Sequence, residues 1–245
     1  MARFRGGQWA ALKPERGVMA AMIVLTAICL VINVGGAPIQ LLAQHLVLRP
    51  RTALGWEPWQ LVTNGFIEPD FIDLLLTFVM FIFFGNPLEQ RLGTRAFWKV
   101  FVGGIIGGSL VAAVVGRIWA PDVPILGAQP AMTALLVAFG ALWAGQQVSA
   151  YGVAQMSATT MTWIFVGINV LACVKAMRAD WHIGLLELSA VAGAGLAGWL
   201  LTRRGGIDIG GLGRSFDRMK MWRLKRRYRV LTGGREGPPN KRWLN

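Results

Sequence analysis

The chain has 245 residues, of which 54% are hydrophobic and only 15% are charged, and its mean hydropathy is +0.49. These values exclude an ordinary soluble domain. Because the apolar residues lie in long blocks, they indicate a polytopic membrane protein. The formal net charge is +13, and 13 of the 25 basic residues fall within residues 203–245. The basic charge therefore belongs mainly to the C-terminal tail.

Six apolar runs are long enough to cross a hydrocarbon core, and each predicts a transmembrane helix. They lie at residues 18–34, 71–86, 98–116, 125–145, 158–175 and 184–202. No small-residue cleavage site follows the first run, so we interpret it as a retained helix and not a signal peptide. The pattern predicts an all-α membrane protein, with a six-helix domain at 18–204 after a basic segment at 1–17.

A long connection at residues 35–70 joins the first two runs. It mixes Pro38, Pro50 and Pro58 with Trp56, Trp59 and several leucines. This segment is too apolar for a free loop and too broken for a span. We expect it to lie half-embedded at the membrane surface, with its tryptophans at the depth of the lipid headgroups.

Basic residues in the short connections set the expected orientation. The N-terminus, the loop at 87–97 and the tail are all basic, and six spans place these three on one side. Because positive loops remain in the cytoplasm, we expect both termini to be cytoplasmic. We expect an integral protein of the bacterial inner membrane.

The stretch from 59 to 98 reads WQLVTNGFIEPDFIDLLLTFVMFIFFGNPLEQRLGTRAFW. It resembles the rhomboid family of intramembrane serine proteases. The positions that match the family's frame are Trp59, Thr63, Phe66, Gly85, Glu89 and Gly93, with Gly127 at the fourth span and Gly198 in the small-residue stripe of the last. The resemblance covers about residues 18–204. It implies the rhomboid six-helix bundle, with a long interfacial loop between helices 1 and 2.

At its family position, Glu89 is expected to brace the loop between the second and third spans, with Arg91 or Arg95 beside it. Trp59 is followed by Gln60, where the family typically has arginine. We expect the residues at these positions to support the fold and not to take part in a reaction.

The catalytic residues of the rhomboid family are absent at the matching positions. Gln129 stands at the nucleophile position, and because it has no hydroxyl it forms no acyl-enzyme. The position of the general base falls on Val191 or Ala190, neither of which can take a proton. We therefore expect no proteolysis by the family's mechanism.

The family's His, His and Asn residues donate hydrogen bonds to the oxyanion, and here Glu68, Asp73 and Thr77 replace them. An ionised carboxylate would repel that negative charge. In one interpretation these three residues and Gln129 line a water-filled cavity that binds a client. In the other, Glu68 and Asp70 form an exposed turn and helix cap, and Asp73 lies in the first helical turn, where acids suit the helix dipole.

A relocated catalytic pair would need His45 or His182 together with Ser109 or Ser189. Ser189 and His182 are seven residues apart, about 10 Å along one helix, which is too far for a hydrogen bond. The chain has no His-Glu-x-x-His zinc motif. We expect neither a metal nor a cofactor.

Residues 205–245 form a basic tail that is predicted to be partly an amphipathic helix. Its apolar stripe consists of Met221, Leu224, Tyr228 and Leu231, at steps of three and four residues. We expect the tail to lie on anionic lipid headgroups. A protein partner is the alternative, and we expect no nucleic acid, because basic charge alone is unspecific.

Together these features predict a rhomboid pseudoprotease. We expect it to bind transmembrane segments of other membrane proteins between its second and fifth spans, in quality control, trafficking or assembly. One alternative is an active rhomboid endopeptidase with another catalytic arrangement. The other is a small-solute transporter, for which Asp73, Gln129 and Glu187 are the intramembrane polar candidates.

Overall fold

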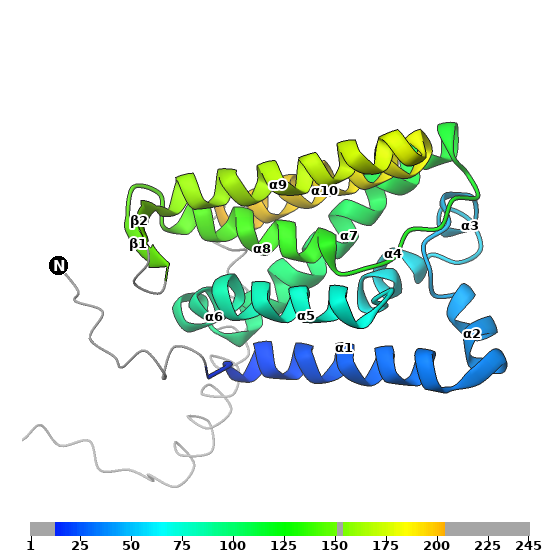
Figure 1. The fold of residues 1–245 in the computed structure, drawn as a ribbon, viewed down its shortest axis with the longest axis horizontal. Helices are drawn as coiled ribbons and strands as arrows, with labels where there is room; N and C mark the ends of the chain where they lie inside the picture. Colours follow the sequence, from blue (N-terminus) through cyan, green and yellow to red (C-terminus); the bar gives the residue numbers. More distant parts are fainter. Residues whose placement is uncertain (1–12, 151–153, 204–245) are drawn as a thin grey trace, which may run out of the picture. The chain divides into compact units, whose positions relative to one another are not determined.

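The computed structural model describes residues 13–150 and 154–203, which form a bundle of helices (Figure 1). The helices are α1 Arg16–Val34, α2 Gly36–Gln44, α3 Pro50–Ala53, α4 Gln60–Thr63, η2 Asn64–Phe66, α5 Phe71–Met80, η3 Phe81–Gly85, α6 Asn86–Leu92, α7 Thr94–Trp119, α8 Gln129–Leu142, α9 Ala158–Ala179 and α10 Trp181–Arg203. The all-α membrane class is confirmed for this part of the chain. The predicted tail at 205–245 lies outside the described residues, as does most of the basic segment at 1–17.

A short antiparallel hairpin connects α8 to α9, and the sequence pattern did not predict it. Strand β1, Gln147–Ala150, pairs with β2, Ala154–Ser157, with Val148 opposite Met156. Both of these side chains pack against the apolar core cluster around Phe84. The hairpin therefore covers one end of the bundle.

Five helices in the described part are long and apolar enough to cross a membrane: α1, the continuous run Phe71–Leu92, α7, α9 and α10. The fourth predicted span, 125–145, was too long, because α8 has only 14 residues. That is about 21 Å of helix, against a hydrocarbon core of about 30 Å. Ile125 is not helical because it pairs with Leu48 in an isolated β-bridge. Ten of the residues of α8 are buried, so the neighbouring helices surround it.

Small residues allow α7, α8 and α10 to approach closely. A Cβ atom on Gly198 of α10 would lie 2.8 Å from the Cα of Ala134 in α8. A Cβ atom on Gly107 of α7 would lie 3.1 Å from the carbonyl oxygen of Gly193. Without a hydrophobic driving force in lipid, such backbone contact is a main source of helix association. Gly198 lies at one of these contacts between helices.

The second span contains a π-helix, η3, and continues beyond residue 86, where we expected it to end. Pro87 has no N–H group, so the regular hydrogen-bond ladder cannot pass through it. Local π geometry is one way in which a membrane helix satisfies the backbone groups that proline frees. The helix then runs to Leu92 and ends at Gly93, whose φ of +84° favours glycine.

The buried carboxylate of Glu89 joins the start of α1 to the turn between α6 and α7. Its Oε1 accepts hydrogen bonds from the backbone N–H of Gly17 at 2.7 Å and from the hydroxyl of Thr94. Its Oε2 accepts from the N–H of Val18 at 2.8 Å. The first N–H groups of a helix have no intrahelical partner and carry the positive end of its dipole. Glu89 supplies both the acceptor and the opposite charge.

The expectation that Glu89 has Arg91 or Arg95 as its partner was wrong. Arg91 donates from Nη1 to the carbonyl oxygen of Leu142 at 2.7 Å, and its guanidinium lies 4.7 Å from the centre of the Trp143 ring. Arg95 is exposed. The carboxylate instead accepts hydrogen bonds from the first turn of α1, which lies more than 70 residues away in sequence.

We predict that Glu89→Ala destabilises the protein, because it leaves two buried helix N–H groups without acceptors. The free energy of unfolding should fall by roughly 2–4 kcal/mol, measured by detergent titration in mixed micelles with circular dichroism. Glu15→Gln is the matched control, because the carboxylate of Glu15 accepts its hydrogen bond from Gln90 at the solvent-exposed surface. It should change stability by less than about 0.5 kcal/mol. Equal losses in the two variants would contradict the capping role.

Candidate functional site

Several of the residues singled out in the sequence, among them Trp59, Thr63 and Glu68, lie at one end of the bundle. We call it the loop end, because α2, α3 and α4 lie there (Figure 1). Leu48 and Ala53 from this segment pack with Ala112 and Ala113 of α7 and with Ala190 of α10. At the opposite end, which we call the hairpin end, lie β1, β2 and α6.

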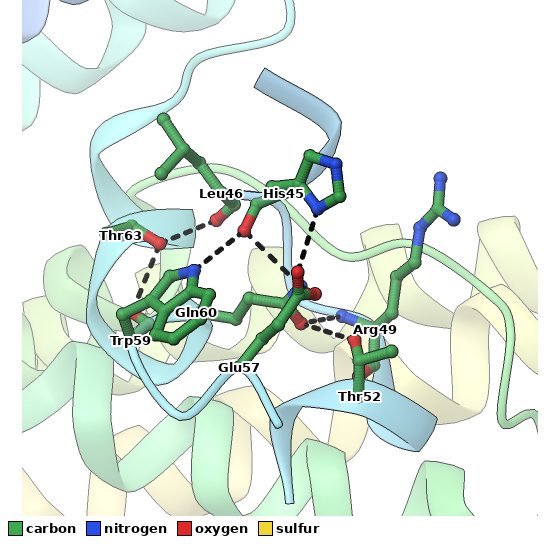
Figure 2. Close-up of polar contacts among 8 residues, drawn as sticks. All are labelled: His45, Leu46, Arg49, Thr52, Glu57, Trp59, Gln60 and Thr63. Atoms are coloured by element: carbon green, nitrogen blue, oxygen red, sulfur yellow. Dashed lines mark hydrogen bonds and ion pairs between the residues drawn. The ribbon is translucent and has the colours of Figure 1, made fainter. Parts of the chain in front are cut away.

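Gln60 is fully buried and connects the irregular segment at the loop end, as Figure 2 shows. Its Oε1 accepts hydrogen bonds from the backbone N–H of Arg49 and from the hydroxyl of Thr52, each at 3.0 Å. Its Nε2 donates to the carbonyl oxygen of His45 and to the carboxylate of Glu57. One side chain thus supplies four bonds that no regular secondary structure provides.

Two positions of the family frame act in the same network (Figure 2). The indole N–H of Trp59 donates to the carbonyl oxygen of His45 at 3.0 Å, and the hydroxyl of Thr63 donates to that of Leu46 at 2.7 Å. The His45 ring lies 2.8 Å from a Glu57 oxygen. These residues hold the segment in place, and His45 is engaged by a carboxylate.

Asn64 links this segment to α7 and to the turn before α8. Its side-chain amide donates to the hydroxyl of Ser109 at 2.9 Å, and both residues are buried. Its carbonyl oxygen accepts from the N–H of Gly127 at 3.1 Å. Gly127 has a φ of +112°, which only glycine adopts without strain. The start of α8 is therefore fixed from two sides.

Glu68 lies at the N-terminus of α8 and is only 4% exposed. It accepts hydrogen bonds from the hydroxyl of Thr77 at 2.9 Å and from the backbone N–H of Ala128. Burial raises the pKa of Glu68 above its ordinary value, although both hydrogen bonds act in the opposite direction. The structure thus brings Glu68 and Thr77 together. The exposed-turn interpretation is wrong for Glu68.

Asp70, Asp73 and Gln129 lie closer to the surface. Asp70 caps α5, since its Oδ1 accepts from the N–H groups of Ile72 and Asp73, each at 2.8 Å. Asp73 is partly exposed in the first turn, as the structural interpretation predicted. Gln129, which we expected to line an internal cavity, is exposed.

The start of α8 and the middle of α10 both lie against α7. Ala190 and Val191 are buried apolar residues of α10. A Cβ atom on Gly108 of α7 would lie 2.7 Å from the Cβ of Pro130 and 2.8 Å from the carbonyl oxygen of Ala190. The first turn of α8 and the middle of α10 therefore both pack against Gly108 of α7.

The remaining candidates for a relocated pair have other partners in the described residues. Ser109 bonds with Asn64, and Ser189 donates to the carbonyl oxygen of Leu186 at 2.7 Å. The ring of His182 lies 3.2 Å from a carboxylate oxygen of Asp180. The backbone N–H of His182 lowers the pKa of that carboxyl. No serine–histidine bond forms among these side chains.

An apolar cavity of about 270 Å³ lies between the second span and α9. It is lined by Val79, Met80, Phe83, Phe84, Met156, Met161, Ile164 and Phe165. The rings of Phe139 and Phe165 meet Phe84 edge-on, at 5.3 and 5.2 Å between centres. Sites for small molecules have about 300–1,000 Å³ and a few convergent polar groups. This cavity is smaller and wholly apolar, so it suits side chains of an apolar partner.

We predict that Gln60→Leu destabilises the protein, because it keeps the apolar volume and leaves the N–H of Arg49 and the Glu57 carboxylate without this partner. The free energy of unfolding should fall by about 2–4 kcal/mol in detergent titration. Thr52→Val, which removes one hydroxyl from the same network, should cost about 1 kcal/mol. A Gln60→Leu variant as stable as the parent would refute the bracing role.

The raised pKa of Glu68 predicts a pH dependence of stability. The folded state binds more protons than the unfolded state between the two pKa values, so this contribution is full below the unfolded pKa and is lost as pH rises through the folded one. Glu68→Gln, which stays neutral, should melt a few degrees higher than the parent near pH 8, and the gain should vanish near pH 4. Thermal unfolding across this range measures it, with the exposed Asp122→Asn as control. A gain that is constant across pH contradicts the assignment.

The comparisons with known proteins place the chain among membrane proteins. No curated protein matches it. A family model described as "Eukaryotic integral membrane protein (DUF1751)" matches residues 16–203, which is the described bundle from α1 to α10. A family described as eukaryotic gives no support to the bacterial inner membrane that we expected. The match covers well over half of the sequence, and the chain therefore belongs to this family of integral membrane proteins.

Proposed function

We propose that this protein is a rhomboid pseudoprotease that binds transmembrane helices of other membrane proteins between its second span and α9. The apolar cavity at that place is the observation that carries the proposal. In this proposal, the protein binds such helices without cleaving them, and it does so in quality control, trafficking or assembly of membrane proteins.

Three features support the rhomboid frame within this proposal. The first turn of α8 meets α10 at Gly108, where the family places nucleophile and base. α8 is a short, enclosed helix. A long irregular segment, braced by Gln60, joins the first two spans. Together with α8 as the sixth membrane helix, these features give the six-helix arrangement that the resemblance implies.

The polar groups at the start of α8 oppose acyl transfer. Gln129 offers no nucleophile, and Ala190 and Val191 offer no base. Glu68 places a carboxyl group where backbone N–H groups at a helix N-terminus could otherwise stabilise an oxyanion. A negative charge there raises the energy of the tetrahedral intermediate, so the site favours holding a segment over cleaving it.

The cavity reaches the surface that faces lipid. Val79 and Ile164 both line it, and their side chains are 41% and 48% exposed. A helix that lies in the bilayer can therefore insert side chains from the membrane plane. Met80, Met156 and Met161 are flexible and polarisable, which suits partners of differing sequence. This composition favours a range of client helices.

We further propose that the hairpin end faces the cytoplasm. Arg16, Arg91, Arg95 and Lys99 lie in the helix ends and turns on that side. The positive-inside bias then places both termini in the cytoplasm. There the basic residues at 205–245 would bind anionic headgroups.

Site-specific crosslinking tests the client site. A photoreactive residue at Ile164 or Val79, in protein reconstituted with a labelled apolar single-span peptide, should capture that peptide several-fold more than one at Val114, which is 51% exposed on α7. Met161→Trp should fill the cavity and reduce capture at Ile164 to the level at Val114. Equal capture at all three positions in the parent protein would refute the proposal.

A further inference from the structure

Glu187 lies inside a membrane span. It is the seventh residue of α10, so it stands about 9 Å from the first residue of the helix along its axis. An ionisable side chain at such a depth is costly in lipid, and it is normally paired or placed in a polar cavity. The partner of Glu187 is therefore a question that the fold has to answer.

The other buried carboxylates have partners within the bundle. Glu89 accepts from the first turn of α1, and Glu68 accepts from Thr77. Among the residues whose side chains the structure describes, three ion pairs form: His45–Glu57, Arg51–Asp122 and His182–Asp180. Glu187 belongs to none of these, and it takes part in no hydrogen bond between described residues. Its carboxylate is available to a group from outside.

Glu187 points toward the bundle and is nevertheless partly exposed. At helical spacing it shares a face with Gly184, Ala190, Val191 and Ala194, which are all buried. Ala190 lies opposite the first turn of α8, and Glu187 stands almost one turn nearer the loop end. The half-buried carboxylate of Glu187 therefore lies beyond the start of α8, on the side of the loop end.

We infer that Glu187 is a specificity-determining residue of the client site, and that it pairs with a lysine or arginine carried within the apolar span of the client helix. The inference rests on the proposed function. Each charge is unfavourable alone in lipid, and each offers the other the hydrogen-bonding group that it needs. Long basic side chains reach several ångströms from their helix axis, so the client backbone can remain at the mouth of the cavity.

The geometry also sets the position of the basic residue in the client. α10 meets α9 at Cys173, because a Cβ atom on Gly184 would lie 2.6 Å from the Cys173 carbonyl oxygen. The cavity residues Met161 to Phe165 precede Cys173 by 8 to 12 residues, about 12–18 Å along α9. Because α10 runs antiparallel to α9, Glu187 stands three residues nearer the hairpin end than Gly184. A client helix beside α9 therefore carries its basic residue about 5 to 9 residues from the side chain that fills the cavity, toward the loop end.

Peptides of matched sequence test this pairing. The probes are three apolar single-span peptides with a central phenylalanine and with Lys, Leu or Glu placed seven residues from it. The parent protein in liposomes should bind the Lys peptide roughly tenfold more tightly than the Leu peptide, and the Glu peptide most weakly. Glu187→Gln should abolish the preference, and Glu187→Lys should transfer it to the Glu peptide. Asp122→Asn, which removes an exposed acid, should keep it.

The outcomes separate this inference from the proposed function. If the parent protein binds all three peptides equally at the cavity, or if Glu187→Gln retains the preference for Lys, the pairing is wrong and the client site stands. If no peptide is captured at Ile164, the client site itself is wrong. Should Glu187→Gln fail to fold, the ranking of the three peptides by the parent protein still decides the matter.

Discussion

Hydrogen bonding without water is the constraint on which this structure depends. Regular helices satisfy their own backbone groups in a membrane, but irregular backbone must find its partners in protein. Gln60 and Asn64 supply them for the segment before α5, and Glu89 supplies them for the first turn of α1. Each is buried. The polar residues inside this apolar protein are thus mostly the ones that make an irregular fold possible.

Under the proposed function, the same constraint explains why a catalytic frame can persist without catalysis. The turn at Gly127 and the hydrogen bond from Ala128 to Glu68 fix the start of α8, and glycine contacts fix α10 beside it. None of these interactions needs a nucleophile or a base. In the proposed pseudoprotease, Gln129 at the nucleophile position and Val191 or Ala190 at the base position therefore leave the packing intact, while Glu68 makes the site unfavourable for an oxyanion.

Much of the fold follows from the sequence, because apolar blocks of sufficient length predict spans. The exceptions depend on distant partners. α8 is shorter than its apolar run because Ile125 pairs with Leu48, and Glu89 serves Gly17 and not its neighbour Arg91. In the sequence, Gln60 was notable only because it stands where the rhomboid family typically has arginine. Its four hydrogen bonds become visible only in the folded segment. Local patterns carry no signal for such pairings.

The two ends of the proposed client site offer complementary kinds of recognition. The cavity beside Phe84 is wholly apolar, so it distinguishes partners only by size and shape. Selectivity among apolar helices in lipid requires a feature that most of them lack, and a basic residue within a span is such a feature. The unpaired carboxylate of Glu187 would recognise such a basic residue by forming an ion pair with it, while the cavity supplies apolar contact area. A site without a catalytic residue can in this way still choose its partners.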